Sequence, residues 1–232
     1  MKKLSLLFFL FIASAIAFSF TRSTSDFEGK VVYSIDFVNS SMPAQAKSMM
    51  AGSTATIYIK GTKSRSDMNM GPQTTTSIYD SKTNTSVMLM EVMGSKYKIK
   101  TEPTKKEEKK PEVKVNVTSE TKTIAGYSCK KAEVTVTDSK GTSHATNIWF
   151  TEEISNHMNS SNENGAQFKD IKGMPLEYEV QAQNGMSMKM TATSVSKETV
   201  ADSKFEIPSD YKETTMEGMQ KEMMQKMQGG QH

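Results

Sequence analysis

The chain is poor in the residues that mark most enzymes and disulfide-stabilised proteins. It has one cysteine, three histidines and one tryptophan in 232 residues. A single cysteine excludes an internal disulfide, so the hydrophobic core must supply the stability. Three scattered histidines argue against a metal site or a Ser-His-Asp arrangement, and no nucleophile motif, HExxH pattern or phosphate-binding loop occurs. We therefore expect a protein without catalytic residues, cofactor or metal ligands. Cys129 opens an expected strand, where a buried small hydrophobe is favoured over a nucleophile.

Strong charge and long apolar runs are also scarce. The net charge is +3, which gives no electrostatic case for nucleic acid as a partner. The one long apolar run, 4–12, follows Lys2 and Lys3 and precedes a small-residue site at Ala15-Ile16-Ala17. This pattern predicts a signal peptide over residues 1–17, cut after about Ala17, and a flexible N-terminus over 18–26. No later run approaches the roughly 20 apolar residues of a transmembrane helix. We expect a soluble periplasmic or secreted protein.

Period-two alternation dominates the rest of the chain. The stretch "FEGKVVYSIDF" at 27–37 places Val31, Tyr33 and Ile35 on one face of a strand. Similar patterns recur to residue 193, separated by short polar turns, and indicate a largely antiparallel sheet with one buried side. The sequence predicts one curved-sheet domain over residues 27–228.

Two segments favour helices and one favours a solvated loop. Residues 40–52 have an early proline and a following glycine, which predicts a short helix. Over 214–228 a methionine stripe, Met216, Met219, Met223 and Met227, predicts an amphipathic C-terminal helix, with Thr214 and Glu217 as a capping box. The run "EPTKKEEKKPE" at 102–112 has no apolar residue and predicts a polar loop.

The most informative stretch is "PLEYEVQAQNGMSMKMTAT" at 175–193, which reads as a hairpin. A two-residue Asn-Gly turn would pair Met188 with Gln181 and Met190 with Glu179. A three-residue loop with a glycine bulge instead pairs Met186 with Ala182, Met188 with Val180, and Met190 with Tyr178. The second register keeps apolar residues on one face and polar residues on the other, so we prefer it.

Three interpretations of the methionines remain open. They are core residues, the lining of a pliable apolar cavity, or thioether ligands for copper(I). The chain has 19 methionines and 10 phenylalanines, a bias that favours a surface able to fit varied apolar shapes. Copper(I) would need methionines from adjacent strands, because alternate residues of one strand lie about 6.6 Å apart.

Several stretches together carry a family resemblance: "FEGKVVYSIDF", "KTIAGYSCKKAEV", "IWFTEEI", "KGMPLEYEV" and "FEIPSDYK". In this order, over residues 27–211, they resemble a family of exported Bacteroidetes proteins classed as a domain of unknown function. That family is similar in turn to Lol-type lipoprotein carriers and to GLPGLI proteins. The resemblance implies a mainly β (α+β) fold, a strongly curved antiparallel sheet or half-open barrel with helices over its concave face. Lol-type carriers hold acyl chains in that concavity.

From alternation, methionine bias and resemblance we expect a non-catalytic protein that binds an apolar ligand, a lipid or a lipidated partner. The alternatives are a methionine-rich copper(I) protein and a structural module of envelope assembly. The residues expected to line the apolar face are Met88, Met90, Tyr178, Val180, Met186, Met188 and Met190, with Met219 and Met223 on the covering helix.

Overall fold

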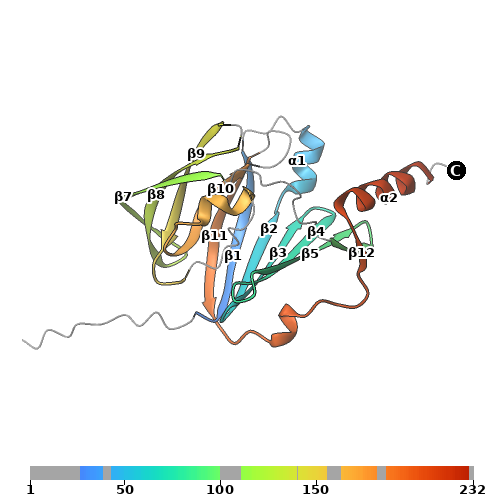
Figure 1. Cartoon of the computed structure of the whole chain (residues 1–232), viewed down its shortest axis with the longest axis horizontal. Helices are drawn as coiled ribbons and strands as arrows, with labels where there is room; N and C mark the ends of the chain where they lie inside the picture. Colours follow the sequence, from blue (N-terminus) through green and yellow to red (C-terminus); the bar gives the residue numbers. More distant parts are fainter. Residues whose placement is uncertain are drawn as a thin grey trace, which may run out of the picture.

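All strands of the described chain belong to one sheet (Figure 1). The structure, a computed structural model, describes residues 27–38, 43–99, 111–139, 141–155, 163–181 and 187–229. The expected signal peptide, the flexible N-terminus and residues 100–110 of the polar-loop region lie outside these ranges. The strands are β1 Gly29–Val38, β2 Thr54–Lys60, β3 Lys63–Met70, β4 Gln73–Asp80, β5 Thr85–Val92, β6 Ser95–Ile99, β7 Glu112–Ile124, β8 Tyr127–Thr137, β9 Ser143–Thr151, β10 Met174–Gln181, β11 Ser187–Lys197 and β12 Lys212–Thr214.

Two meanders make up the sheet, whose strand order is β12-β6-β5-β4-β3-β2-β1-β11-β10-β9-β8-β7. Strands β1 to β6 pair with their successors in the chain, as do β7 to β11, and every one of these pairs is antiparallel. The meanders join where β1 pairs with β11. One expectation fails, because β12 pairs parallel to β6 and makes the sheet mixed. A parallel pair needs a long crossover, and the segment 198–211 supplies it.

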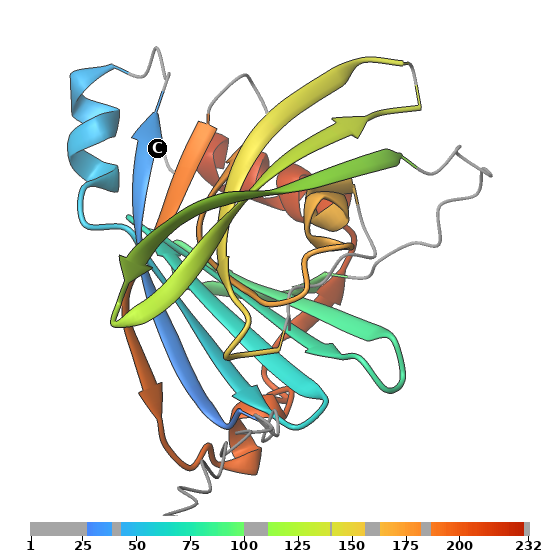
Figure 2. The same ribbon diagram turned by 90° about the vertical axis from the view of Figure 1, so that its left-hand side faces the viewer.

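The sheet is strongly curved and open (Figure 2). Its order ends at β7 and β12, so it does not close into a barrel. The mainly β expectation is confirmed. The described chain has two α-helices, α1 Ala44–Met50 and α2 Met216–Gly229, and two 3₁₀ helices, η1 Glu163–Phe168 and η3 Asp202–Phe205. Helix α2 and η1 lie inside the curve, and η3 lies outside it. The expectation that helices cover the concave face is wrong for α1, which has no buried residue.

Alternation explains why these residues form strands. In β1, Val31, Tyr33 and Ile35 are buried while the residues between them are half-buried or exposed. Strand β2 repeats the pattern with Ala55, Ile57 and Ile59. Branched and aromatic side chains favour extended backbone and pack on one side of a pleated surface. The main core therefore lies on the concave side of the sheet, while Ile78 of β4 and Leu89 of β5 are buried on the opposite side.

Helix α2 starts later than the sequence predicts. Thr214 is the last residue of β12, and Thr215 caps the helix instead: its side-chain oxygen accepts a hydrogen bond from the Gly218 backbone N–H at 3.0 Å. The predicted Thr214–Glu217 capping box is therefore wrong by one residue. A threonine oxygen at this place satisfies one of the donors that a helix leaves unpaired at its first turn.

Helix α1 rests on the turn between β3 and β4. A Cβ atom on Gly71 would lie 2.7 Å from the Met49 carbonyl oxygen, and the φ angle of Gly71 is 56°. Glycine is required here both by the left-handed backbone and by the close approach of α1. Met49 and Met50 are thereby held at the end of the sheet where β3 finishes and β4 begins.

Candidate functional site

The register of the β10–β11 hairpin agrees with the three-residue-loop interpretation. Tyr178 pairs with Met190, Val180 with Met188, and Glu179 with Lys189. The hairpin register predicted from the sequence is therefore confirmed over the described residues. Residues 182–186, including the predicted site residue Met186, lie outside them. Met190 and Met188 thus share a side of the sheet with Tyr178 and Val180, while the charged residues take the other side.

The pairing of backbone residues shows that the same side of the sheet continues from β10 to β6. Tyr178 pairs with Met190 and Met190 with Ile35, and one row further along, Tyr33 pairs with Ala55. That row continues through the successive partners Ala55, Met68, Thr75, Met90 and Tyr97. Opposite residues of a ladder share a face. The six described sheet residues predicted for the site therefore lie on one face, which we term the apolar face.

The apolar face carries no Asp, Glu, Lys or Arg on the described strands β1 to β6 and β10. Its positions are Val31, Tyr33, Ile35, Phe37, Ala55, Ile57, Ile59, Ser64, Ser66, Met68, Met70, Gln73, Thr75, Ser77, Tyr79, Ser86, Met88, Met90, Val92, Ser95, Tyr97, Ile99, Leu176, Tyr178 and Val180. The charged residues of these strands, Arg65 and Glu91 among them, lie on the opposite, convex face. Charge is thus excluded from a surface that is only partly buried.

At the β9–β11 side of the apolar face, two predicted site residues are core. Tyr178 and Met190 are 4% and 2% exposed. The Tyr178 ring packs edge-on against Tyr33 at 5.9 Å and against Phe168 of η1 at 5.0 Å between ring centroids. Val180 and Met188, one row away, pack on this core but stay half-buried.

The Tyr178 hydroxyl is a polar group in this apolar setting. The neighbouring Tyr33 hydroxyl donates a hydrogen bond to the Pro175 carbonyl at 2.7 Å. Among the described residues, none makes a hydrogen bond with the Tyr178 hydroxyl. Burial raises the pKa of Tyr178, so the phenol is neutral at physiological pH. A buried hydroxyl without a partner costs roughly 1–3 kcal/mol, and such a group in a native protein calls for an explanation.

The other four predicted residues form a second cluster under α2, which we term the methionine cluster. Met88 and Met90 of β5 meet Met219 and Met223 of α2, together with Val92, Tyr97 and Ile99. Met219 is 6% exposed and Met90 8%. The Tyr97 hydroxyl donates to the Met223 sulfur at 3.9 Å, which fixes the helix above β6. Of the nine predicted residues, eight are described: six lie on the apolar face and two on α2 above it, and they divide equally between the two clusters.

Between and beside the two clusters the apolar face is half-buried. Met68, Thr75 and Ser77 lie between them and are neither fully buried nor fully exposed. Towards the ends of β1, β3 and β10, the half-buried Phe37, Met70, Met188 and Val180 follow. Met49 and Met93, at 56% and 71% exposed, lie at this same end of the sheet. Burial on the apolar face therefore decreases from the core to a half-buried, methionine-rich end. We term this end, formed by Phe37, Met70, Met188 and Val180, the rim.

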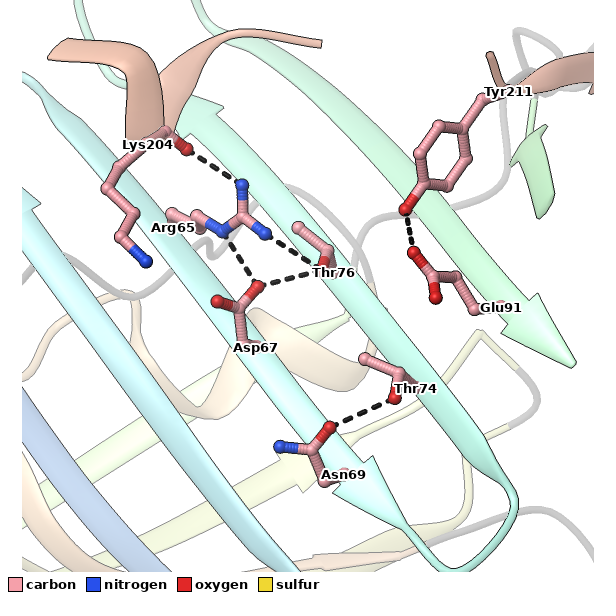
Figure 3. Close-up of polar contacts among 8 residues, drawn as sticks. All are labelled: Arg65, Asp67, Asn69, Thr74, Thr76, Glu91, Lys204 and Tyr211. Atoms are coloured by element: carbon pink, nitrogen blue, oxygen red, sulfur yellow. Dashed lines mark hydrogen bonds and ion pairs between the residues drawn. The ribbon is translucent and has the colours of Figure 1, made fainter. Parts of the chain in front are cut away.

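The convex face is held by polar contacts with the segment 198–214 (Figure 3). Arg65 donates to the Lys204 carbonyl at 2.9 Å and to the Asp67 carboxylate at 2.7 Å. Tyr211 donates to the Glu91 carboxylate, and the Lys96 ammonium lies 2.8 Å from the Asp210 carboxylate. These contacts hold the segment 198–211 against the convex face of β3 to β6. The chain then passes the edge of the sheet and enters α2.

Several residues of the apolar face were not predicted from the sequence. Phe168 directly follows residues 155–167, a stretch that reads as a polar loop or a poor helix, and only its contact with Tyr178 reveals its role. Tyr97 and Ile99 showed alternation, yet nothing marked them as the partners of α2. Met68 lies in the "MNM" repeat at 68–70, a signal that the sequence did offer.

Cys129 is buried, as predicted. Its exposure is zero, and burial raises the pKa of its thiol to about 11. The thiol is therefore protonated at neutral pH, which makes it a poor nucleophile. In the described part of the chain, no group of three or more His, Cys, Asp or Glu side chains is placed to hold a metal ion. In the same part, no helix has both the length and the apolar character to cross a membrane.

Fold and site together define a class: a mainly β protein built on one open, curved sheet, with a methionine-rich helix over a face that carries no charged residue on the described strands β1 to β6 and β10. The chain belongs to the DUF4412 family, a domain of unknown function, whose sequence model matches residues 40–211. The family resemblance read from the sequence is confirmed to that extent. A comparison with curated proteins finds no match. The matched region ends at Tyr211, so β12 and α2 lie beyond it.

Proposed function

We propose that this protein is a non-catalytic carrier that binds an apolar ligand, a lipid or the lipid chain of a partner protein, against the apolar face. The observation that carries the proposal is the absence of charge from a face that is not fully buried. A face used only as core would be closed over, whereas Met68, Met70 and Met188 are left half-buried. Soluble proteins rarely leave such apolar surface open without a binding role.

The residue types on the face support an adaptable site. Methionine side chains are flexible and polarizable, and they repack around ligands of different shape. The hydroxyls of Ser66, Thr75 and Ser77 give small polar points without charge. The likeness to Lol-type carriers, which hold acyl chains in the concavity of a half-open barrel, supports the same proposal.

The exported location predicted from residues 1–17 fits a carrier that moves lipid outside the cytoplasm. We propose that location together with the function, and the N-terminal sequence of the mature protein tests it.

The test of the function is direct ligand recovery. The mature protein is purified without detergent and denatured, and its lipids are measured by mass spectrometry. Uptake of a fluorescent fatty acid is measured in parallel. Co-purified lipid and saturable uptake are expected. A lipid-free preparation that takes up no probe overturns the proposal.

A matched pair of variants assigns the ligand to the face. Met68→Glu puts a charge on the apolar face, whereas Asn69→Glu puts the same charge on the convex face one residue later. Loss of uptake is expected only for Met68→Glu, with circular dichroism as the check of folding. Met68→Ser serves as a milder change if the charged variant unfolds. Equal uptake by all variants would place the ligand elsewhere.

Copper(I) binding is the second candidate function, and the methionine cluster favours it. Thioethers suit soft ions, and the cluster contains four methionines, two from β5 and two from α2 rather than from adjacent strands. Anaerobic titration with copper(I) against a chelator of known affinity tests it. Met90→Leu with Met223→Leu keeps the side-chain size and removes two sulfurs, so it should abolish binding. A wild-type protein that cannot compete with the chelator excludes this function.

A further inference from the structure

The apolar contacts described between helix α2 and the sheet are made by methionine side chains. From Thr214 to His232 the sequence contains no Leu, Ile, Val, Phe, Tyr or Trp, so methionine is its only large apolar residue. Among the helix side chains described, Met219 is the one that is buried, and Met223 is half-buried beside it. Both pack on Met88, Met90 and Tyr97.

The polar contacts of the helix add little to this attachment. Lys226 donates to the Ser95 hydroxyl at 2.8 Å, and Lys212 lies 2.6 Å from the Glu222 carboxylate, with both lysines exposed. Exposed ion pairs of this kind contribute little to stability, because solvent screens the charges and the side chains lose freedom. A helix of 14 residues is also marginal on its own in water. The two methionine contacts therefore decide whether α2 stays on the sheet.

Methionine differs from leucine in one chemical respect that matters here. A two-electron oxidant such as hypochlorous acid transfers an oxygen atom to the thioether, which gives methionine sulfoxide, chloride and a proton. Hydrogen peroxide gives the sulfoxide and water. The sulfur loses two electrons and the oxidant gains them. The product is polar, unsuited to an apolar contact, and is returned to the thioether by methionine sulfoxide reductases at the cost of a dithiol.

We propose that Met219 and Met223 are oxidation-sensitive modification sites, and that their conversion to sulfoxides releases α2 and uncovers the methionine cluster. Met223 is half-buried, so we expect an oxidant to reach its side chain without unfolding of the protein. Its sulfur accepts the hydrogen bond from the Tyr97 hydroxyl at 3.9 Å, so oxidation changes the atom that makes this contact. Release then exposes Met219 and the sheet residues beneath it. The inference rests on the packing of the helix and does not require the proposed carrier function.

The rate of trypsin cleavage within α2 shows whether the helix is packed on the sheet or released from it. Lys221 and Lys226 lie within α2, and Lys189 lies within β11 and reports global unfolding. After graded treatment with hypochlorous acid, peptide mass spectrometry gives the oxidation of each methionine. Cleavage at Lys221 and Lys226 should become at least about tenfold faster once Met219 and Met223 are oxidised, with cleavage at Lys189 unchanged. Treatment with a sulfoxide reductase should restore the slow rate.

The chain provides its own control residues. Met224 and Met93 are 63% and 71% exposed and should oxidise first. Oxidation confined to these two should leave cleavage within α2 unchanged. If the helix stays protected although Met219 and Met223 carry sulfoxides, the proposal is overturned.

Two variants separate the helix contact from damage elsewhere. Met219→Leu with Met223→Leu keeps apolar volume and removes the oxidisable sulfurs, so oxidation should no longer speed cleavage within α2. Met223→Gln is a polar substitute for the sulfoxide and should speed cleavage without oxidant. A leucine variant that releases the helix on oxidation as readily as the natural chain would overturn the assignment to these two residues.

Discussion

Met190 and Met188 lie two residues apart on the same face of β11, yet they should respond very differently to truncation. Met190 is 2% exposed and packs beside Tyr178, whereas Met188 is half-buried at the rim. If the apolar face grades from core to binding surface, Met190→Ala should damage the fold. Met188→Ala should damage ligand binding and leave the fold largely intact.

The magnitudes follow from burial. Truncating a fully buried methionine to alanine costs about 2–5 kcal/mol, because apolar contacts are lost and a cavity remains. In a protein of this size each kilocalorie lowers the melting temperature by roughly 2–4 °C, so Met190→Ala should lose roughly 4–20 °C. Met188 gives up only part of its apolar surface on folding, so Met188→Ala should cost about 1 kcal/mol.

Urea unfolding followed by tryptophan fluorescence measures both variants. Trp149, the single tryptophan, lies on the convex side of β9, and the Lys122 ammonium is 4.2 Å from its ring centroid, so neither substitution touches the probe. Fatty-acid uptake is measured on the same samples. A Met188→Ala variant as unstable as Met190→Ala would show that both positions are core. Unchanged uptake by a stable Met188→Ala would show that the rim takes no part in binding.

Three further predictions concern single side chains. Tyr178→Phe removes a buried hydroxyl for which the described residues offer no partner, so the free energy of unfolding in urea should be unchanged or rise by up to about 1 kcal/mol, and a loss above about 2 kcal/mol would reveal a partner. Cys129, whose pKa is raised to about 11, should react with iodoacetamide at pH 8 about a hundredfold more slowly than a free thiol until urea unfolds the chain, and fast labelling of the native protein would contradict its burial. Burial and the hydrogen bond to Glu91 raise the pKa of Tyr211, so the folded state holds that proton more tightly than the unfolded chain. The stability from Tyr211 is complete below about pH 10 and is lost as pH rises above it, so Tyr211→Phe should reduce the alkaline loss of stability; equal losses in both proteins would refute this.

Much of the sheet could be predicted because one physical rule decides it. Alternation of apolar and polar residues predicted β1 and β2 to within two residues at each end, since a strand with one buried side cannot shift by one position without turning its apolar residues to solvent. The less regular runs at 63–70, 73–81 and 84–92 were predicted as shorter strands, and they match β3, β4 and β5. The same rule selected the register of Tyr178 with Met190 over that of a generic Asn-Gly turn. The pattern of apolar and polar residues in the sequence therefore predicted which residues share the apolar face.

The division of the face into two clusters could not be predicted, because it depends on contacts between distant parts of the chain. Nothing near Met219 shows that β12 pairs beside β6 and brings α2 over Met90. The capping residue was misplaced for the same reason: Thr214 was taken up by the sheet, and the helix had to begin one residue later. Phe168 gave no signal, because a 3₁₀ turn has no apolar period to read.

The join between the two meanders carries a kinetic consequence. Every pair other than β1–β11 and β6–β12 links strands that follow one another in the chain, whereas β1 joins β11 by matching Gly29 with Lys197. Each half of the sheet is therefore assembled from local hairpins, but closing the seam means bringing together segments at opposite ends of the sequence, a step of high contact order and large loop-closure entropy. Until that seam closes, apolar residues that it buries, such as Tyr33 of β1 and Met190 of β11, are exposed to other molecules. Refolding yield should fall steeply with protein concentration, and dilution should restore it.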